Sequence, residues 1–110
     1  MHRLGLVVLL SACAAALAQS LPPGRSAELV RIVRQDCGSC HGMRLTGGLG
    51  PALTSDALAG KPPAALAATI IHGRFGTPMP GWRGVLSDAD ADWIAAQLVR
   101  GFPDEGSRAP

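Results

Sequence analysis

Apolar residues recur at helical spacing in three stretches of the chain, and residues that favour turns separate these stretches. In the first stretch, Leu29, Ile32 and Val33 lie at positions i, i+3 and i+4, which is the spacing of one apolar helix face. Ser26 precedes them and has the side chain of a helix N-cap. We therefore expect a first helix that is capped by Ser26 and runs from about residue 27 to residue 36.

The second stretch begins with prolines and ends at a glycine. Pro63 suits the first position of a helix, because the N–H that it lacks would have no helical partner there. Ala64–His72 is rich in alanine, and Leu66 and Ile70 lie four residues apart within it. Gly73 follows at the position where many helices end in a left-handed conformation. The pattern predicts a second helix that begins near Pro63 and ends at Gly73.

The third stretch has both of its ends marked. Ser87 and Asp90 have the spacing of a capping box, with Asp in place of the usual Glu, and Gly101 closes the segment. One face of this predicted helix carries Trp93, Ile94, Gln97 and Leu98. Between the helical stretches the chain is rich in glycine and proline, with room for a short helical turn at residues 56–60. The pattern predicts an all-α domain of three to five helices.

The first 18 residues have the composition of an export signal. Arg3 provides a basic start, residues 4–10 are apolar, and small residues lead to Ala18, as in a cleaved signal peptide. Two alternatives remain open. One is an uncleaved membrane anchor, for which the apolar stretch is short, and the other is a lipoprotein, because Leu10-Ser11-Ala12-Cys13 resembles a bacterial lipobox. We expect cleavage after Ala18, a periplasmic location and no stable membrane insertion afterwards.

The remainder of the chain is long enough for one domain. We assign residues 19–25 to an irregular lead-in, residues 26–102 to the domain and residues 103–110 to a flexible tail. The formal net charge of the whole chain is +2. No block of basic residues interleaved with aromatic residues occurs, so nothing in the sequence favours a nucleic-acid partner.

The first predicted helix leads into Cys37-Gly38-Ser39-Cys40-His41, which has the C-x-x-C-H pattern of c-type haem attachment. Cys37 and Cys40 are spaced to reach the two vinyl groups on one porphyrin edge, and His41 then lies under the iron as its proximal ligand. A thioredoxin-type redox pair would need a βαβ context, and a zinc site would need two further ligands. The chain shows neither pattern, so we expect one covalently bound haem c.

Two loops carry the other candidate haem contacts. Pro51 ends a glycine-rich loop, and its carbonyl is a free acceptor for the second ring N–H of His41, as ligating histidines usually require. Met79 lies between two prolines, which hold its loop extended, and its soft sulfur suits haem iron as a sixth ligand. We expect Pro51 to support His41 and Met79 to complete the coordination of the iron.

Three nearby residues are weaker candidates for contact with the haem. His72, at the end of the second predicted helix, is better explained as a partner of the helix's negative end than as an iron ligand. Met43 is too close in sequence to His41 to reach the opposite face of the haem. Trp82 either donates a hydrogen bond from its indole N–H to a haem propionate or belongs to the core, and the sequence leaves both interpretations open.

Taken together, these features resemble a small class I c-type cytochrome: an export signal, a helix into C-x-x-C-H, Gly50-Pro51, a methionine loop and a C-terminal helix with an aromatic residue. The loops Leu45–Leu53 and Gly76–Trp82 are most similar to those of the NirC-type periplasmic cytochromes c of denitrification gene clusters. The resemblance implies a helical fold around one haem, with His41 and Met79 as axial ligands. It also implies a carrier of single electrons among periplasmic redox proteins, with cytochrome cd nitrite reductase as a candidate partner.

Two other functions stay open beside the electron carrier. A haem protein with a displaceable sixth ligand could act in maturation of the d-type haem or in sensing, and a thiol oxidoreductase would use Cys37 and Cys40 as free thiols. Catalysis has the weaker case, because no general acid other than His72 lies near the methionine loop in the sequence. We expect no enzymatic activity.

Charge is distributed unevenly along the chain. Residues 25–83 hold seven basic and three acidic residues, whereas residues 84–110 hold two basic and five acidic residues. This is either an ordinary solvated surface or a charge asymmetry that turns the haem edge towards an acidic patch on a partner. On the second interpretation, the residues that matter most flank the two ligand loops: Arg44, Lys61, Arg74 and Arg83.

Overall fold

The structure is a computed structural model that describes residues 21–106. Within that range the chain forms helices, turns and loops and no strand, so the predicted all-α fold is confirmed. The helical elements are α1 (Arg25–Ile32), the π-helical segment η1 (Val33–Cys37), α2 (Gly38–His41), α3 (Pro63–His72) and α4 (Asp88–Arg100). The predicted signal peptide and Cys13 lie outside the described residues. No helix in residues 21–106 is long and apolar enough to cross a membrane.

The first helical run begins earlier than the sequence predicts. Helix α1 starts at Arg25, and its N-cap is Gly24 in a left-handed conformation with φ of 79°. The backbone N–H of Glu28 donates to the Gly24 carbonyl, so the chain is already helical at Ser26. The prediction that Ser26 caps this helix is therefore wrong, because the glycine turns the chain two residues earlier.

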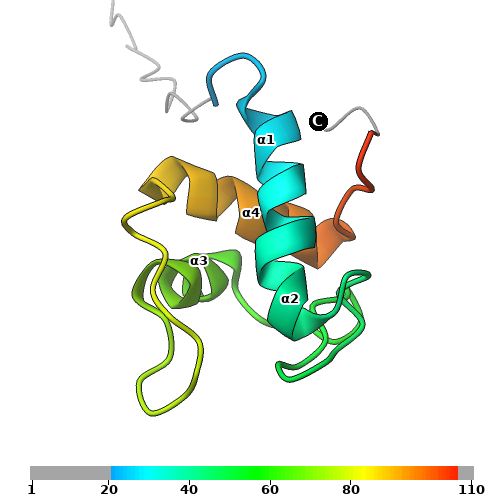
Figure 1. Cartoon of the computed structure of the whole chain (residues 1–110), viewed down its shortest axis with the longest axis vertical. Coiled ribbons are helices and arrows are strands. Elements are labelled where there is room, and N and C mark those ends of the chain that lie inside the picture. Colours follow the sequence, from blue (N-terminus) through cyan, green and yellow to red (C-terminus); the bar gives the residue numbers. More distant parts are fainter. Residues whose placement is uncertain (1–20, 107–110) are drawn as a thin grey trace, which may run out of the picture.

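Helices α1 and α2 form one continuous run through η1, drawn vertically in Figure 1. The residues at both junctions, Val33 and Cys37, keep right-handed helical angles. In η1 the N–H of Gly38 donates to the carbonyl of Val33, five residues back, which inserts one extra residue into the helix. Such insertions occur often at functional sites, and this one ends at Cys37, the first cysteine of the C-x-x-C-H motif.

Helices α3 and α4 have the ends that the sequence predicts. Pro63 is the first residue of α3, and Gly73 ends it with φ of 70°. At the start of α4, Ser87 Oγ accepts the N–H of Asp90 at 3.0 Å, and Asp90 accepts the N–H of Ser87 at 3.0 Å. These two bonds complete the predicted capping box, and Gly101 closes the helix. The chain at residues 56–60 forms hydrogen-bonded turns.

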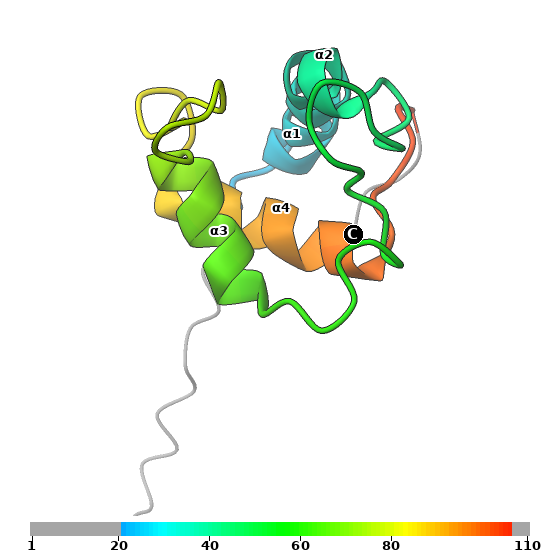
Figure 2. The same cartoon turned by 90° about the horizontal axis from the view of Figure 1, so that it is seen from below.

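The core lies where α1 and η1 meet α4, with α3 packed against α4. Figure 1 shows α4 crossing behind α1, and Figure 2 shows α3 beside α4. Ala91 and Ala95 of α4 have no exposed surface, and such small side chains allow the helices to approach closely. Leu29 and Ile94 are buried, and each buried side chain of this size stabilises the fold by about 1.5–3 kcal/mol.

Two arginines connect segments that lie far apart in the sequence. Arg25 of α1 donates from Nε and Nη2 to the carboxylate of Asp90 in α4, at 3.1 and 2.6 Å. Arg34 of η1 donates to the carbonyls of Phe102 and Pro103 and lies over the Phe102 ring, 5.5 Å from its centroid. The segment after α4 is therefore held against the helix that leads to Cys37.

Candidate haem-binding site

His41, the last residue of α2, has one ring nitrogen fixed by the loop that follows. Its Nδ1 lies 2.7 Å from the carbonyl oxygen of Pro51, as the sequence predicts. A carbonyl can only accept, so Nδ1 donates the proton of this bond. The lone pair of the neutral imidazole then resides on Nε2, which is the arrangement that a metal-ligating histidine requires.

The loop after α2 is folded back onto the motif by backbone hydrogen bonds. Gly47 N–H donates to the His41 carbonyl, and Gly50 N–H donates to the Cys40 carbonyl, both at 2.8 Å. A Cβ on Gly50 would lie 2.8 Å from two atoms of the His41 ring. The glycine therefore leaves space that the imidazole fills, which explains why a side chain is absent next to Pro51.

Leu45 anchors the same loop to the core and was not predicted from the sequence. It is buried, adopts a positive φ of 59°, and accepts the N–H of Leu53 at 2.8 Å. In the sequence Leu45 is one of a few scattered apolar residues in a glycine-rich loop, and these have no periodicity and therefore no predictive pattern. Its burial makes the loop a fixed support of His41.

The two cysteines lie on successive turns at the end of the helical run. Cys37 is half-buried and Cys40 is exposed, and no disulfide joins them. Burial, followed by the nearby charge of Asp36, raises the pKa of Cys37 to about 11. Burial thus disfavours the thiolate at Cys37, which is the form that a thiol oxidoreductase needs as its nucleophile.

The other alternative, a zinc site, finds no support in the described part of the chain. Residues 21–106 contain no group of three or more His, Cys, Asp or Glu residues that could hold a metal ion. A structural zinc site built on Cys37 and Cys40 would need two such ligands in addition. The chemistry of the motif instead fits a group that brings its own metal.

Met79 lies in the loop between α3 and α4, and the base of this loop is tightly closed. The N–H of Arg74 donates to the Met79 carbonyl at 3.2 Å, and the N–H of Trp82 donates to the Ile70 carbonyl at 3.0 Å. A Cβ on Gly73 would lie 2.6 Å from Gly81 N, so the two arms of the loop touch at the glycines. Met79 is therefore held by the backbone on both sides and is itself half-buried.

The motif and the methionine loop come to the same side of the molecule. In Figure 1 the end of α2 and the α3–α4 loop both lie at the lower side, and in Figure 2 both lie in the upper half of the view, with the loop to the left of α2. The loop after α2 lies beside the motif. Residues 37–41 and Met79 therefore come from two separately supported segments at one side of the molecule.

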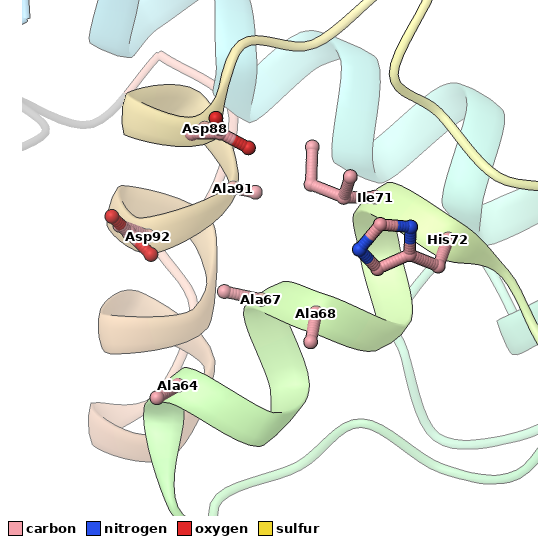
Figure 3. A pocket seen from close by; sticks show the side chains of 8 residues that line it. All are labelled: Ala64, Ala67, Ala68, Ile71, His72, Asp88, Ala91 and Asp92. Atoms are coloured by element: carbon pink, nitrogen blue, oxygen red, sulfur yellow. The ribbon is translucent and has the colours of Figure 1, made fainter.

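The two remaining candidate haem contacts, Trp82 and His72, lie in different surroundings. Trp82 packs against the hydrophobic core, in agreement with the core interpretation. His72 is exposed and lines a groove between α3 and α4, with Asp88 and Asp92 on the other wall (Figure 3). None of the cysteines, His41 or Met79 lines this groove.

These residues fit a c-type haem. The motif offers two unpaired thiols, His41 offers an imidazole nitrogen whose partner nitrogen is already hydrogen-bonded, and a supported loop offers a thioether. Imidazole and thioether are the axial ligand pair of cytochromes c. The donor set and the glycine space beside the imidazole therefore both match the group that the sequence predicts.

Comparisons with known proteins agree with this geometry. Residues 24–98 match the family described as cytochrome c oxidase, cbb3-type, subunit III. Cytochrome c55X of Stutzerimonas stutzeri is 53% identical over 88 residues, which are 80% of this chain and 78% of that protein. The solved structure of the c-type cytochrome NirC is 55% identical, with a TM-score of 0.71, and the match covers 73% of this chain and 94% of that one.

A larger protein contains a similar domain. The dihydro-heme d1 dehydrogenase of Pseudomonas aeruginosa is 42% identical over 74 residues, which are 67% of this chain but 15% of the dehydrogenase. The similarity is thus confined to one part of that protein. The family match and the near full-length relatives show that the chain belongs to the class I c-type cytochromes of the cytochrome c55X and NirC type, with haem c as its cofactor.

Proposed function

We propose that Cys37 and Cys40 hold the haem through thioether bonds, that His41 Nε2 is the proximal ligand and that Met79 Sδ is the sixth ligand. The observation that carries this assignment is the 2.7 Å contact between His41 Nδ1 and the Pro51 carbonyl. It fixes the tautomer and the ring orientation that iron ligation needs. The bound haem would supply a one-electron couple between ferrous and ferric iron.

With these ligands the protein is an electron carrier, not an enzyme. A sixth ligand on a loop with a hydrogen-bonded base keeps the iron saturated and changes little in shape between the two oxidation states. We further propose that it acts in the periplasm during denitrification and exchanges electrons with cytochrome cd nitrite reductase. The similarity to cytochrome c55X and NirC and the two NirC-like loops support this partner.

The absorption spectrum of the matured protein and its reaction with carbon monoxide test the ligand set. Met79→Ala should remove the sulfur-to-ferric-iron band, lower the midpoint potential and open the iron to carbon monoxide, because Met/His ligation raises the haem potential. Met43→Ala is the matched control, since Met43 is an exposed methionine, and it should change none of these properties. Ready binding of carbon monoxide by the wild-type protein would overturn the carrier assignment.

The covalent attachment of the haem is tested separately from its axial ligands. Replacing Cys37 and Cys40 together by Ala should abolish covalent haem, and alkylation of the matured wild-type protein should find no free thiol at either position. Free thiols in protein matured in the periplasm would exclude this assignment and favour the thiol oxidoreductase.

Export is tested by the mass of the mature chain. We propose cleavage after Ala18, which leaves residues 19–110 and removes Cys13. A mature N-terminus at Cys13 with an added lipid mass would show the lipoprotein alternative, and an intact Met1 would show an uncleaved anchor.

A second function has one observation in its favour. The chain resembles a domain of a dihydro-heme d1 dehydrogenase, and a haem protein with a displaceable sixth ligand could act in maturation of the d-type haem or in sensing. Deletion of the gene separates the two proposals. A carrier leaves nitrite reductase fully loaded with d-type haem but slowly reduced, whereas a maturation factor leaves the reductase without that haem.

A further inference from the structure

Phe75 is an aromatic residue that does not pack against the core. The chain has four aromatic residues, and three of them, Trp82, Trp93 and Phe102, pack against the core. The Phe75 side chain, in contrast, is fully exposed to solvent. A single exposed apolar side chain is ordinary, but the turn that carries Phe75 holds it in a fixed position.

The turn that carries Phe75 is fixed by its own hydrogen bonds. The Thr77 N–H and hydroxyl both donate to the Arg74 carbonyl, at 3.2 and 2.7 Å, and the Met79 N–H donates to Thr77 Oγ1 at 3.3 Å. Gly76 has φ of 77°, which is the requirement of the third position of a type II turn. Phe75 is therefore the second residue of the turn and stands at its apex.

This turn belongs to a loop that stands out from the helices. Figure 1 shows the α3–α4 loop projecting from the lower side of the molecule, and Figure 2 shows it beyond the end of α3. The base of the loop holds Met79 through the bond between Arg74 N and the Met79 carbonyl. An aromatic side chain is thus presented to solvent next to the residue that we propose as an iron ligand.

Two properties define what this apex can bind. Phe75 offers a large apolar surface, and the neighbouring Arg74 is exposed and forms no side-chain hydrogen bond or ion pair within residues 21–106. A rigid aromatic residue beside an arginine is typical of interface hot spots, because little conformational entropy is lost when the contact forms. The complementary surface is an apolar pocket with a carboxylate at its rim.

We infer that Phe75 is the anchor by which this cytochrome docks on its electron-transfer partner, inserting its ring into an apolar pocket while Arg74 meets a carboxylate. This inference rests on the proposed function, since it assigns the contact residue of the carrier. It places the contact on the same loop as Met79, so docking and electron transfer occur at one side of the molecule.

The test uses the haem-loaded protein as electron donor to cytochrome cd nitrite reductase, with transfer followed by stopped flow over a range of reductase concentrations. Phe75→Ala should raise the concentration for half-maximal rate about tenfold, and Phe75→Leu should raise it less, because leucine keeps part of the apolar surface. The absorption spectrum and midpoint potential should stay unchanged. Val85→Ala is the matched control, since Val85 is an exposed apolar residue outside both ligand loops, and it should not change the concentration dependence.

Other results of this experiment distinguish a failure of the docking role from a failure of the proposed partner. An unchanged half-maximal concentration in Phe75→Ala overturns the docking role alone, whereas no transfer by the wild-type protein overturns the proposed partner and the inference with it. A shifted spectrum or potential in Phe75→Ala shows that the ring contacts the haem and not a partner. A wild-type dimer in sedimentation that Phe75→Ala dissociates shows that a second copy occupies Phe75 and also overturns the inference.

Discussion

A single imidazole depends on two unusual neighbours in the loop that follows it. Pro51 supplies a carbonyl at 2.7 Å from His41 Nδ1, and Gly50 supplies the space in which the ring lies. Neither residue could be exchanged freely, because the carbonyl must reach the ring while the preceding residue must not touch it. The Gly-Pro pair is therefore a steric and hydrogen-bonding requirement of His41.

Gly50→Ala should displace the imidazole or the loop, because the new Cβ would lie 2.8 Å from ring atoms of His41. We expect a loss of about 1–3 kcal/mol in the free energy of unfolding, as for other overpacked sites, together with a change in the haem spectrum. Denaturant unfolding and absorption spectroscopy measure both effects. Gly84→Ala is the control, since its Cβ would meet nothing within 4 Å, and equal stability of the two variants would contradict the steric argument.

At the level of the elements, the side chain of Asp90 links the start of α4 to α1. Asp90 closes the capping box with Ser87 and also accepts two hydrogen bonds from Arg25 of α1. The Arg25 hydrogen bonds are the largest cause that lowers the pKa of Asp90 in the folded protein, while burial opposes them. Because the folded pKa lies below the unfolded one, Asp90 adds stability above the unfolded pKa and loses it as the pH falls through the folded pKa.

Asp90→Asn should therefore destabilise the protein near neutral pH and matter less in acid. We expect a loss of about 1.5–3 kcal/mol at pH 7, the range for hydrogen bonds to charged groups. The difference in unfolding free energy from the wild type should shrink as the pH falls below about 4. Denaturant titrations between pH 2 and pH 7 measure this, with Asp92→Asn, on the exposed side of α4, as the control. If the difference in unfolding free energy does not depend on pH, Asp90 stabilises the protein through packing and not through its charge.

The helical run before the motif is supported by the segment that follows α4. Arg34 donates to the Phe102 and Pro103 carbonyls, and Trp93 meets the Phe102 ring edge to face, with centroids 6.1 Å apart. These contacts place the segment after α4 against η1, the element that ends at Cys37. The haem motif is thus held from both directions along the sequence.

For the molecule as a whole, the distribution of charge bears on the encounter with a partner. Arg44, Lys61, Arg74 and Arg83 are all exposed. Arg83 lies 3.5 Å from Asp88, a surface pair of the kind that contributes little to stability. These basic residues remain available to an acidic partner, and steering by such charges weakens with salt, because the screening length is about 10 Å at 0.1 M.

Arg74→Glu combined with Arg83→Glu should slow electron transfer to nitrite reductase at low salt and leave the haem spectrum unchanged. The expected effect on the association rate is about tenfold or more, since steering raises encounter rates by 10 to 1,000-fold. Stopped-flow rates over a series of salt concentrations measure it. Arg31→Glu combined with Arg100→Glu gives the same change in net charge at exposed positions on α1 and α4. Rates that do not respond to salt would show an apolar interface without steering.

The sequence by itself determined the features that depend on near neighbours. The motif at residues 37–41, the Pro63 and Gly73 ends of α3 and the capping box of α4 all involve residues within a few positions of one another. Backbone geometry and covalent spacing are set over that range, so a local pattern is sufficient. The same holds for the contact of His41 with Pro51, because a second acceptor for a ligating imidazole is a chemical necessity.

Only the tertiary structure decided which distant groups meet. Arg25 pairs with Asp90 across 65 residues, Arg34 reaches Pro103 across 69, and α1 begins at Arg25 because Gly24 turns the chain. The tertiary structure also decided that Phe75 stays in solvent, whereas the other three aromatic residues pack against the core. These outcomes depend on how the helices pack in three dimensions, and no periodicity along the chain encodes the partner of a single side chain.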